Sequence, residues 1–105
     1  MRQYTGREFL LKRQFRGNIL IINMQAKIIS LKGIIFESAI KSLSVMTKSG
    51  EITVLPNHRP LLTSLKPGVI RIIDKDSSEK FFEVHSGFLE VKKNKEKTFL
   101  TVLVD

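Results

Sequence analysis

The sequence predicts an all-β domain, and three observations support this prediction. Runs of five to eight residues rich in Ile, Val, Phe and Thr recur about every ten residues from Met24 onward, which is typical of a sandwich or barrel. Residues that favour turns separate these runs. No segment carries apolar residues at a sustained helical spacing over the ten or more positions of a globular helix. We therefore expect an antiparallel β-sandwich of short strands.

The expected strands follow one another along the chain with a turn signal after each. They are 25–31, 33–39 leading into 40–48, 51–55, 69–74, 81–86, 88–93 and 98–104. All three prolines, Pro56, Pro60 and Pro67, fall within one short stretch, so a stiff proline-rich loop is expected before 69–74. At its end, residues 66–69 predict a type II turn, because proline presets the first central dihedral and Gly68 permits a positive φ.

Alternation within the strands predicts which side chains lie in the core. In the strand 69–74, Ile70 and Ile72 are the core candidates, because the opposite face carries Arg71 in mid-strand. In the strand 98–104, both faces are apolar. This pattern indicates a central strand or a strand covered by a partner protein.

Length and composition limit the possible classes of protein. A chain of 105 residues is long enough for one modest core, and the absence of cysteine excludes disulfides and thiolate metal sites. No apolar run approaches the roughly 18 residues of a membrane-spanning helix. These properties are typical of one small soluble domain.

The net charge of +8 is divided unevenly, and this division separates residues 1–23 from residues 24–105. Residues 1–23 hold five basic side chains and one acidic side chain, a net charge of +4. This basic N-terminal extension is interpreted as a solvated tail or as sequence upstream of the native start, because Met24 stands where the strand pattern begins. A basic arm that contacts an anionic partner and a transit peptide are the alternatives.

The sequence carries no motif for catalysis or for a cofactor. His85 and Ser86 are adjacent on a strand and point to opposite faces, so they cannot form a nucleophile–base pair. The two histidines, His58 and His85, are too far apart in sequence for a metal-binding pattern, and no glycine-rich nucleotide loop is present. We expect no enzyme activity, no metal and no cofactor.

A small basic β-barrel that binds nucleic acid is the alternative function. Such modules stack bases on exposed aromatic rings that are surrounded by Lys and Arg. The phenylalanines of the strands are instead expected in the core or in an interface, and the lysines gather in turns. The rings that decide between these functions are Phe81, Phe82, Phe88 and Phe99.

The proline-rich stretch, with residues 84–93 and 99–105, resembles the epsilon chain of the F-type ATP synthase, which is called delta in mitochondria. In that family the stretch reads approximately G-x-x-G-x-x-P-x-H-x-P-x-x-T-x-x-x-x-G, then a strand, then S-G-G-x-x-E-V. Residues 27–47, with Phe36, are similar to the opening strands, and the resemblance covers residues 25–105. The matching positions are Gly50, Pro56, His58, Pro60, Leu61, Leu62, Thr63, Pro67, Gly68, Gly87, Leu89, Glu90 and Val91.

The resemblance implies a function and partners. The domain 24–105 would be a non-catalytic β-sandwich at the foot of the central stalk, or rotor, of a proton-translocating F-type ATP synthase. Its partners would be the gamma chain and the ring of c subunits, with no homo-oligomer and no nucleic acid. It would couple rotation of the c ring to the catalytic head. It would be peripheral to the membrane, on the cytoplasmic face of the bacterial inner membrane or the equivalent organelle face.

The resemblance also implies which residues serve this function. The loop that faces the c ring would consist of Gly50, Glu51, Pro56, Asn57 and His58, and its prolines would make the contact stiff. Glu51 would pair with a basic side chain of a c-subunit loop. The residues that shape the turns and scaffold would be Pro60, Pro67, Gly68 and Gly87.

Some positions depart from the family pattern. Thr53 and Asn57 stand where glycine is common; asparagine accepts a positive φ readily, whereas β-branched threonine does not. His85 and Ser86 replace Ser-Gly before Gly87. The sequence stops at Asp105, where the family continues into a carboxy-terminal helical hairpin that restrains ATP hydrolysis. We therefore expect no hairpin and no ATP-dependent regulation by this chain.

Overall fold

The computed structural model describes residues 24–105, and the predictions made for residues 1–23 lie outside this range. The described residues form strands and turns without a helix, so the all-β prediction is confirmed. No helix long and apolar enough to cross a membrane occurs among them. The strands are β1 (Met24–Ser30), β2 (Gly33–Thr47), β3 (Gly50–Val54), β4 (Leu61–Leu65), β5 (Gly68–Asp74), β6 (Glu79–Val84), β7 (Gly87–Asn94) and β8 (Lys97–Val104).

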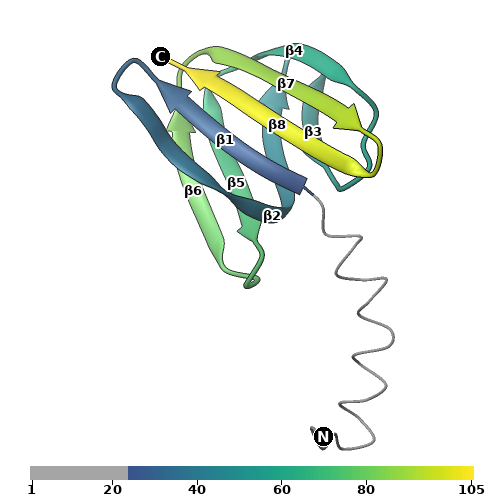
Figure 1. Cartoon of the computed structure of the whole chain (residues 1–105). Helices are drawn as coiled ribbons and strands as arrows, with labels where there is room; N and C mark the ends of the chain where they lie inside the picture. The colour runs from purple at the N-terminus through teal and green to yellow at the C-terminus, as the bar shows by residue number, and fades with distance from the viewer. Residues whose placement is uncertain (1–23) are drawn as a thin grey trace, which may run out of the picture.

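The strands form two layers that share β2 (Figure 1). One layer has the order β1-β8-β7-β4, and the other contains β3, β2, β5 and β6. The first half of the 15-residue β2 pairs with β1, and its second half pairs with β3 and β5. Because β2 belongs to both layers, the two sheets are joined and enclose one core.

Most neighbouring strands are antiparallel, as predicted, but β1 and β8 run parallel. Their register places Met24 beside Thr98 and Ile29 beside Leu103. The first and last strands therefore lie side by side, with β8 inside the sheet between β1 and β7. The prediction of a central strand is therefore met, but the outer face of β8, with Phe99 and Leu103, remains exposed.

The core fills the space between the layers. Ile70 and Ile72 are buried, as the alternation in β5 predicts, and Leu43 and Val45 of β2 are buried with them. Phe36 and Phe82 pack against this core as an edge-to-face aromatic pair, with ring centroids 5.5 Å apart. The other buried hydrophobic residues are Met24, Ala26, Ile28, Ile40, Val54, Leu65, Val84, Leu89, Val91, Leu100 and Val102.

The proline-rich stretch differs from the prediction in two respects. Residues 61–65 are the strand β4, which pairs with β7, rather than loop. The predicted type II turn is wrong, because Gly68 does not have a positive φ and is already part of β5. The strands β4 and β5 do not pair with each other, so the chain passes from one layer to the other at Pro67 without the reversal that a type II turn makes.

Candidate functional site

The residues predicted to face the c ring lie along one edge of the sandwich. Gly50, with φ of 112°, and the exposed Glu51 begin β3, whereas Pro56, Asn57 and His58 follow its end. Since a strand rises about 3.3 Å per residue, β3 separates the two groups by roughly 15 Å. Among the described strands, β3 pairs only with β2, so it is an edge strand. The predicted site is therefore an edge with a turn at each end, not one loop.

The loop after β3 is held by specific hydrogen bonds. The N–H of His58 donates to the carbonyl of Leu55 at 3.1 Å, and Asn57 has φ of 73°, a conformation that asparagine tolerates. The N–H of Asn57 donates to the hydroxyl of buried Thr98 at 2.8 Å. This bond attaches the loop to the start of β8, 41 residues away in sequence.

The His58 ring is oriented by its neighbour. Its Nδ1 lies 2.7 Å from the carbonyl oxygen of Arg59. A carbonyl can only accept, so Nδ1 carries a proton and Nε2 remains the atom for an outside partner. Thr53, which stands where the family often has glycine, lies in the strand β3. The hydroxyl oxygens of Thr53 and Ser44 are hydrogen-bonded at 2.9 Å.

The predicted scaffold residues have different roles. Pro60 directly precedes β4, and Pro67 lies at the crossing into β5. A Cβ on Gly87 would lie 2.0 Å from the carbonyl oxygen of Leu103, so β7 approaches β8 more closely there than a side chain allows. A Cβ on Gly68 would meet the Cβ of Met46 at 3.4 Å and the carbonyl oxygen of Lys66 at 3.9 Å, which are ordinary contact distances. Gly87 is therefore required by packing, and Gly68 is not.

The outer face of the β1-β8-β7-β4 layer carries exposed apolar side chains, with polar residues such as Glu90, Lys92 and Thr101 between them. Phe88 and Leu103 are cross-strand partners on this face, and Ile29 of β1 continues the row beyond Leu103. Ile34 and Leu31 extend the surface at the β1–β2 turn. The exposed fractions on this face are 70% for Leu62, 52% for Phe88, 48% for Leu103 and 38% for Phe99. We call this set of seven residues the apolar face.

The outer face of the β3-β2-β5-β6 layer carries polar side chains together with the exposed apolar residues Phe81, Val69 and Met46. Arg71 Nε lies 2.7 Å from Glu79 Oε2, and the hydrogen-bonded Ser44 and Thr53 hydroxyls lie in the same row. Phe81 is exposed on this face, but its cross-strand partner is Arg71. Both outer faces therefore carry exposed apolar side chains beside polar ones, with Phe88 exposed on the first layer and Phe81 on the second.

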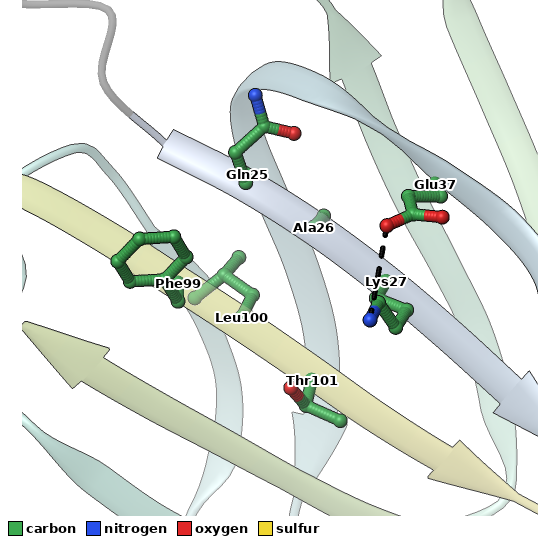
Figure 2. A pocket seen from close by; sticks show the side chains of 7 residues that line it. All are labelled: Gln25, Ala26, Lys27, Glu37, Phe99, Leu100 and Thr101. Carbon is green, nitrogen blue, oxygen red and sulfur yellow. Dashed lines mark ion pairs between the residues drawn. The ribbon is translucent and has the colours of Figure 1, made fainter.

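A shallow groove of about 300 Å³ lies on the layer that carries the apolar face (Figure 2). Its lining includes the ring of Phe99 and the hydroxyl of Thr101 from β8, with Gln25 and Lys27 from β1. Lys27 Nζ lies 3.7 Å from Glu37 Oε2, so the charges in the groove are already paired. This lining has the composition of a contact surface.

The titratable groups of the described residues have structural roles. Within residues 24–105, no three side chains of the metal-binding type converge. The N–H groups of Ser78 and Asp76 each donate to Asp74 Oδ1 at 2.9 Å. The hydrogen bond from Ser78, with that from Asp76 and the charge of Lys80, lowers the pKa of Asp74 against the opposing effect of burial. The carboxylate therefore stabilises the β5–β6 turn.

Two features of this surface have no signal in the sequence. Thr98 holds the loop in place because its hydroxyl accepts a hydrogen bond from the N–H of Asn57, yet in the sequence it looks like an ordinary strand residue. The same bond brings Arg59 of the loop to the end of the sandwich that carries Lys97. Contacts between strands distant in sequence leave no local pattern.

The comparisons with known proteins agree with this fold. The sequence model of a family described as ATP synthase, Delta/Epsilon chain, beta-sandwich domain matches residues 23–105, and the chain belongs to this family. An ATP synthase epsilon chain from Hydrogenovibrio crunogenus (strain DSM 25203 / XCL-2) is 35% identical over 86 residues. That alignment covers 82% of this chain and 56% of the relative. This chain thus spans little more than half the length of the curated relative that it matches.

Solved structures show the same fold at low sequence identity. A chain of the Euglena gracilis mitochondrial ATP synthase, from an OSCP/F1/c-ring structure, has a TM-score of 0.71 at 15% identity, covering 79% of this chain and 51% of that chain. A chain of the Tetrahymena thermophila mitochondrial ATP synthase, from a central stalk/c-ring structure, has a TM-score of 0.62 at 15% identity. It covers 77% of this chain and 63% of that chain.

Proposed function

We propose that the chain is a non-catalytic subunit of the central stalk, or rotor, of a proton-translocating F-type ATP synthase. In this role it binds the gamma chain and the c ring and couples rotation of the ring to the catalytic head. It is peripheral to the membrane through the complex, on the cytoplasmic face of a bacterial inner membrane or the equivalent organelle face. Membership of the delta/epsilon family supports this proposal.

The single observation that carries the proposal is the apolar face. Its four most exposed side chains on β4, β7 and β8 present about 400 Å² of apolar surface, taking roughly 200 Å² for a full side chain. An exposed apolar area of this size is within the usual range for the largest patch of a soluble domain, and such patches are often functional. We assign it to the gamma chain, because a stalk subunit needs a lasting contact and apolar burial provides one.

The edge strand β3 is the surface assigned to the c ring. Its two ends carry Glu51 and the loop with His58. A contact along an extended edge, rather than at a single point, suits transmission of torque. The hydrogen bonds of Asn57 and His58 resist deformation of the loop under load. This assignment rests on what the resemblance implies for Gly50, Glu51 and residues 56–58, of which Gly50, Pro56 and His58 match the family pattern and Asn57 departs from it.

The alternative, a nucleic-acid-binding module, is not favoured. Phe82 is half-buried against the core, and exposed Phe88 is flanked by Leu103 and Ser64 rather than by basic side chains. Phe81 is exposed beside Arg71, but Arg71 is paired with Glu79. Only Phe99 has an exposed lysine, Lys92, as its cross-strand partner.

The experiment that tests the proposal is complex formation with the gamma chain of the same organism. The full chain and gamma are mixed and separated on a sizing column at moderate salt. Co-elution in a stable stoichiometric complex is the expected result. Separate elution, together with binding of the chain to single-stranded nucleic acid that falls steeply with salt, would contradict the proposal and support the alternative.

A further inference from the structure

The charge of the described residues is concentrated at one end of the sandwich. Residues 24–105 hold 13 basic and nine acidic side chains, a net charge of +4. The loop after β3 and the β7–β8 hairpin contribute five basic and two acidic side chains, a net charge of +3. All other described residues hold eight basic and seven acidic side chains. We call Arg59, Lys92, Lys93, Lys95 and Lys97 the basic end.

The fold brings these side chains together from separate parts of the sequence. The hydrogen bond from Asn57 to Thr98 attaches the loop that carries Arg59 to the start of β8. Lys93 pairs with Thr98 across the β7–β8 hairpin, and Lys95 lies in its turn. Met24 also pairs with Thr98, so the basic segment 1–23, with its net charge of +4, joins the domain at this same end.

The basic end is not neutralised by the domain itself. The five side chains are exposed, and Lys92 is the only one in an ion pair within residues 24–105, at 3.9 Å from Glu90. Among these described residues, Arg59, Lys93, Lys95 and Lys97 have no acidic partner within 4.0 Å. Extended lysines on a hairpin without a pocket suit a diffuse anionic surface better than a single small ligand.

We propose that the basic end docks on the anionic lipid headgroups of the membrane that surrounds the c ring. The inference rests on the proposed function, because the rotor position brings the β3 edge to the ring, and the basic end adjoins one end of that edge. The long side chains of Lys93, Lys95 and Lys97 reach the headgroups while β3 contacts protein. Electrostatic attraction of this kind holds basic segments at anionic leaflets.

The test measures sedimentation of the full chain with lipid vesicles. The vesicles contain phosphatidylcholine with or without about one third phosphatidylglycerol, at roughly 0.1 M salt. The test variant is the triple substitution Lys93→Gln, Lys95→Asn and Lys97→Gln; asparagine is chosen because residue 95 has φ of 58°. The matched control removes the same charge elsewhere, by Lys32→Gln, Lys48→Gln and Lys66→Gln.

The expected result is binding of the parent chain to anionic vesicles only. Each lysine near an anionic surface strengthens binding about fivefold, so the test variant loses roughly a hundredfold and the control changes by less than about threefold. Equal losses in both variants, or no loss in either, would overturn the proposal. Binding of the chain to an acidic peptide or to single-stranded DNA but not to anionic vesicles would also overturn it.

The same variants keep this inference separate from the proposed function. The substituted lysines lie outside the apolar face, so both triple variants should co-elute with the gamma chain as the parent does. Co-elution with gamma without binding to vesicles refutes the lipid contact and leaves the stalk function intact. Loss of co-elution for the parent chain refutes the stalk function itself.

Discussion

Replacing one phenylalanine on each side of the sandwich tests which face binds the gamma chain. Phe88→Ser removes a ring from the centre of the apolar face, where its cross-strand partner is Leu103. Phe81→Ser removes a ring of similar exposure, 60% against 52%, from the opposite face. Both residues point outward from strands, so the two substitutions alter the folded domain in similar ways.

The expected effect follows from the surface that the ring would bury. About half of a phenylalanine side chain of roughly 200 Å² is exposed at residue 88, so about 100 Å² is available to a partner. At about 25 cal/mol per Å², its loss weakens binding by about 2.5 kcal/mol. This corresponds to an increase in Kd of roughly sixtyfold. Phe81→Ser should change Kd by less than about threefold.

Calorimetric titration of each variant with the gamma chain measures these constants. Thermal unfolding of the free variants is the control for folding, and the two melting temperatures should fall by similar amounts, since each substitution loses a β-favouring aromatic residue. An equal loss of affinity in both variants would refute the assignment of the apolar face. A larger loss in Phe81→Ser would move the interface to the other layer.

Three further sets of substitutions test the structure. Gly87→Ala should destabilise the domain by about 2–3 kcal/mol and lower Tm by on the order of 10–20 °C, because its Cβ would meet the Leu103 carbonyl at 2.0 Å. The control, Gly68→Ala, should stay within about 1 kcal/mol of the parent. Equal losses of stability in the two variants would show that Gly87 has no special role. Asn57→Gly should preserve Tm, whereas Asn57→Val should cost about 1–2 kcal/mol at this positive φ, and a neutral valine variant would contradict the loop conformation. The pKa of Asp74 is lower in the folded protein than in the unfolded one, so its stabilising effect is present above the unfolded value and is lost as pH falls through the folded value. When the pH is lowered from about 6 to about 2, the free energy of unfolding of Asp74→Asn, measured by urea titration, should therefore fall less than that of the parent. The same dependence of the unfolding free energy on pH in both proteins would argue against this role.

Much of the fold is predictable because its signals are local. The alternation around Ile70 and Ile72 reports burial directly, since successive side chains of a strand face opposite sides. The apolar pattern on both faces of β8 correctly predicts an internal strand. The strand β4 is missed because it lies between two prolines, Pro60 and Pro67, which predict a loop. Its pairing with β7, distant in sequence, supplies the order that its own composition does not indicate.

The candidate site is also predicted only in part from the sequence. The pattern of glycine, prolines and His58 identifies the family from sequence, yet it presents Glu51 and His58 as members of one loop, whereas β3 places them at opposite ends of an edge. The conformation of Gly68 depends on whether β4 and β5 pair with each other, and a tetrapeptide cannot report that.

The sequence by itself determined the all-β class, the main core residues and the family, because each depends on the order of residues along a short stretch. Only the tertiary structure decided that Leu62, Phe88 and Leu103 share one exposed face and that Arg59 lies at the same end as Lys97. Both arrangements depend on pairing between strands that are far apart in the chain. Such pairing is set by packing of the whole core, and no local pattern carries it.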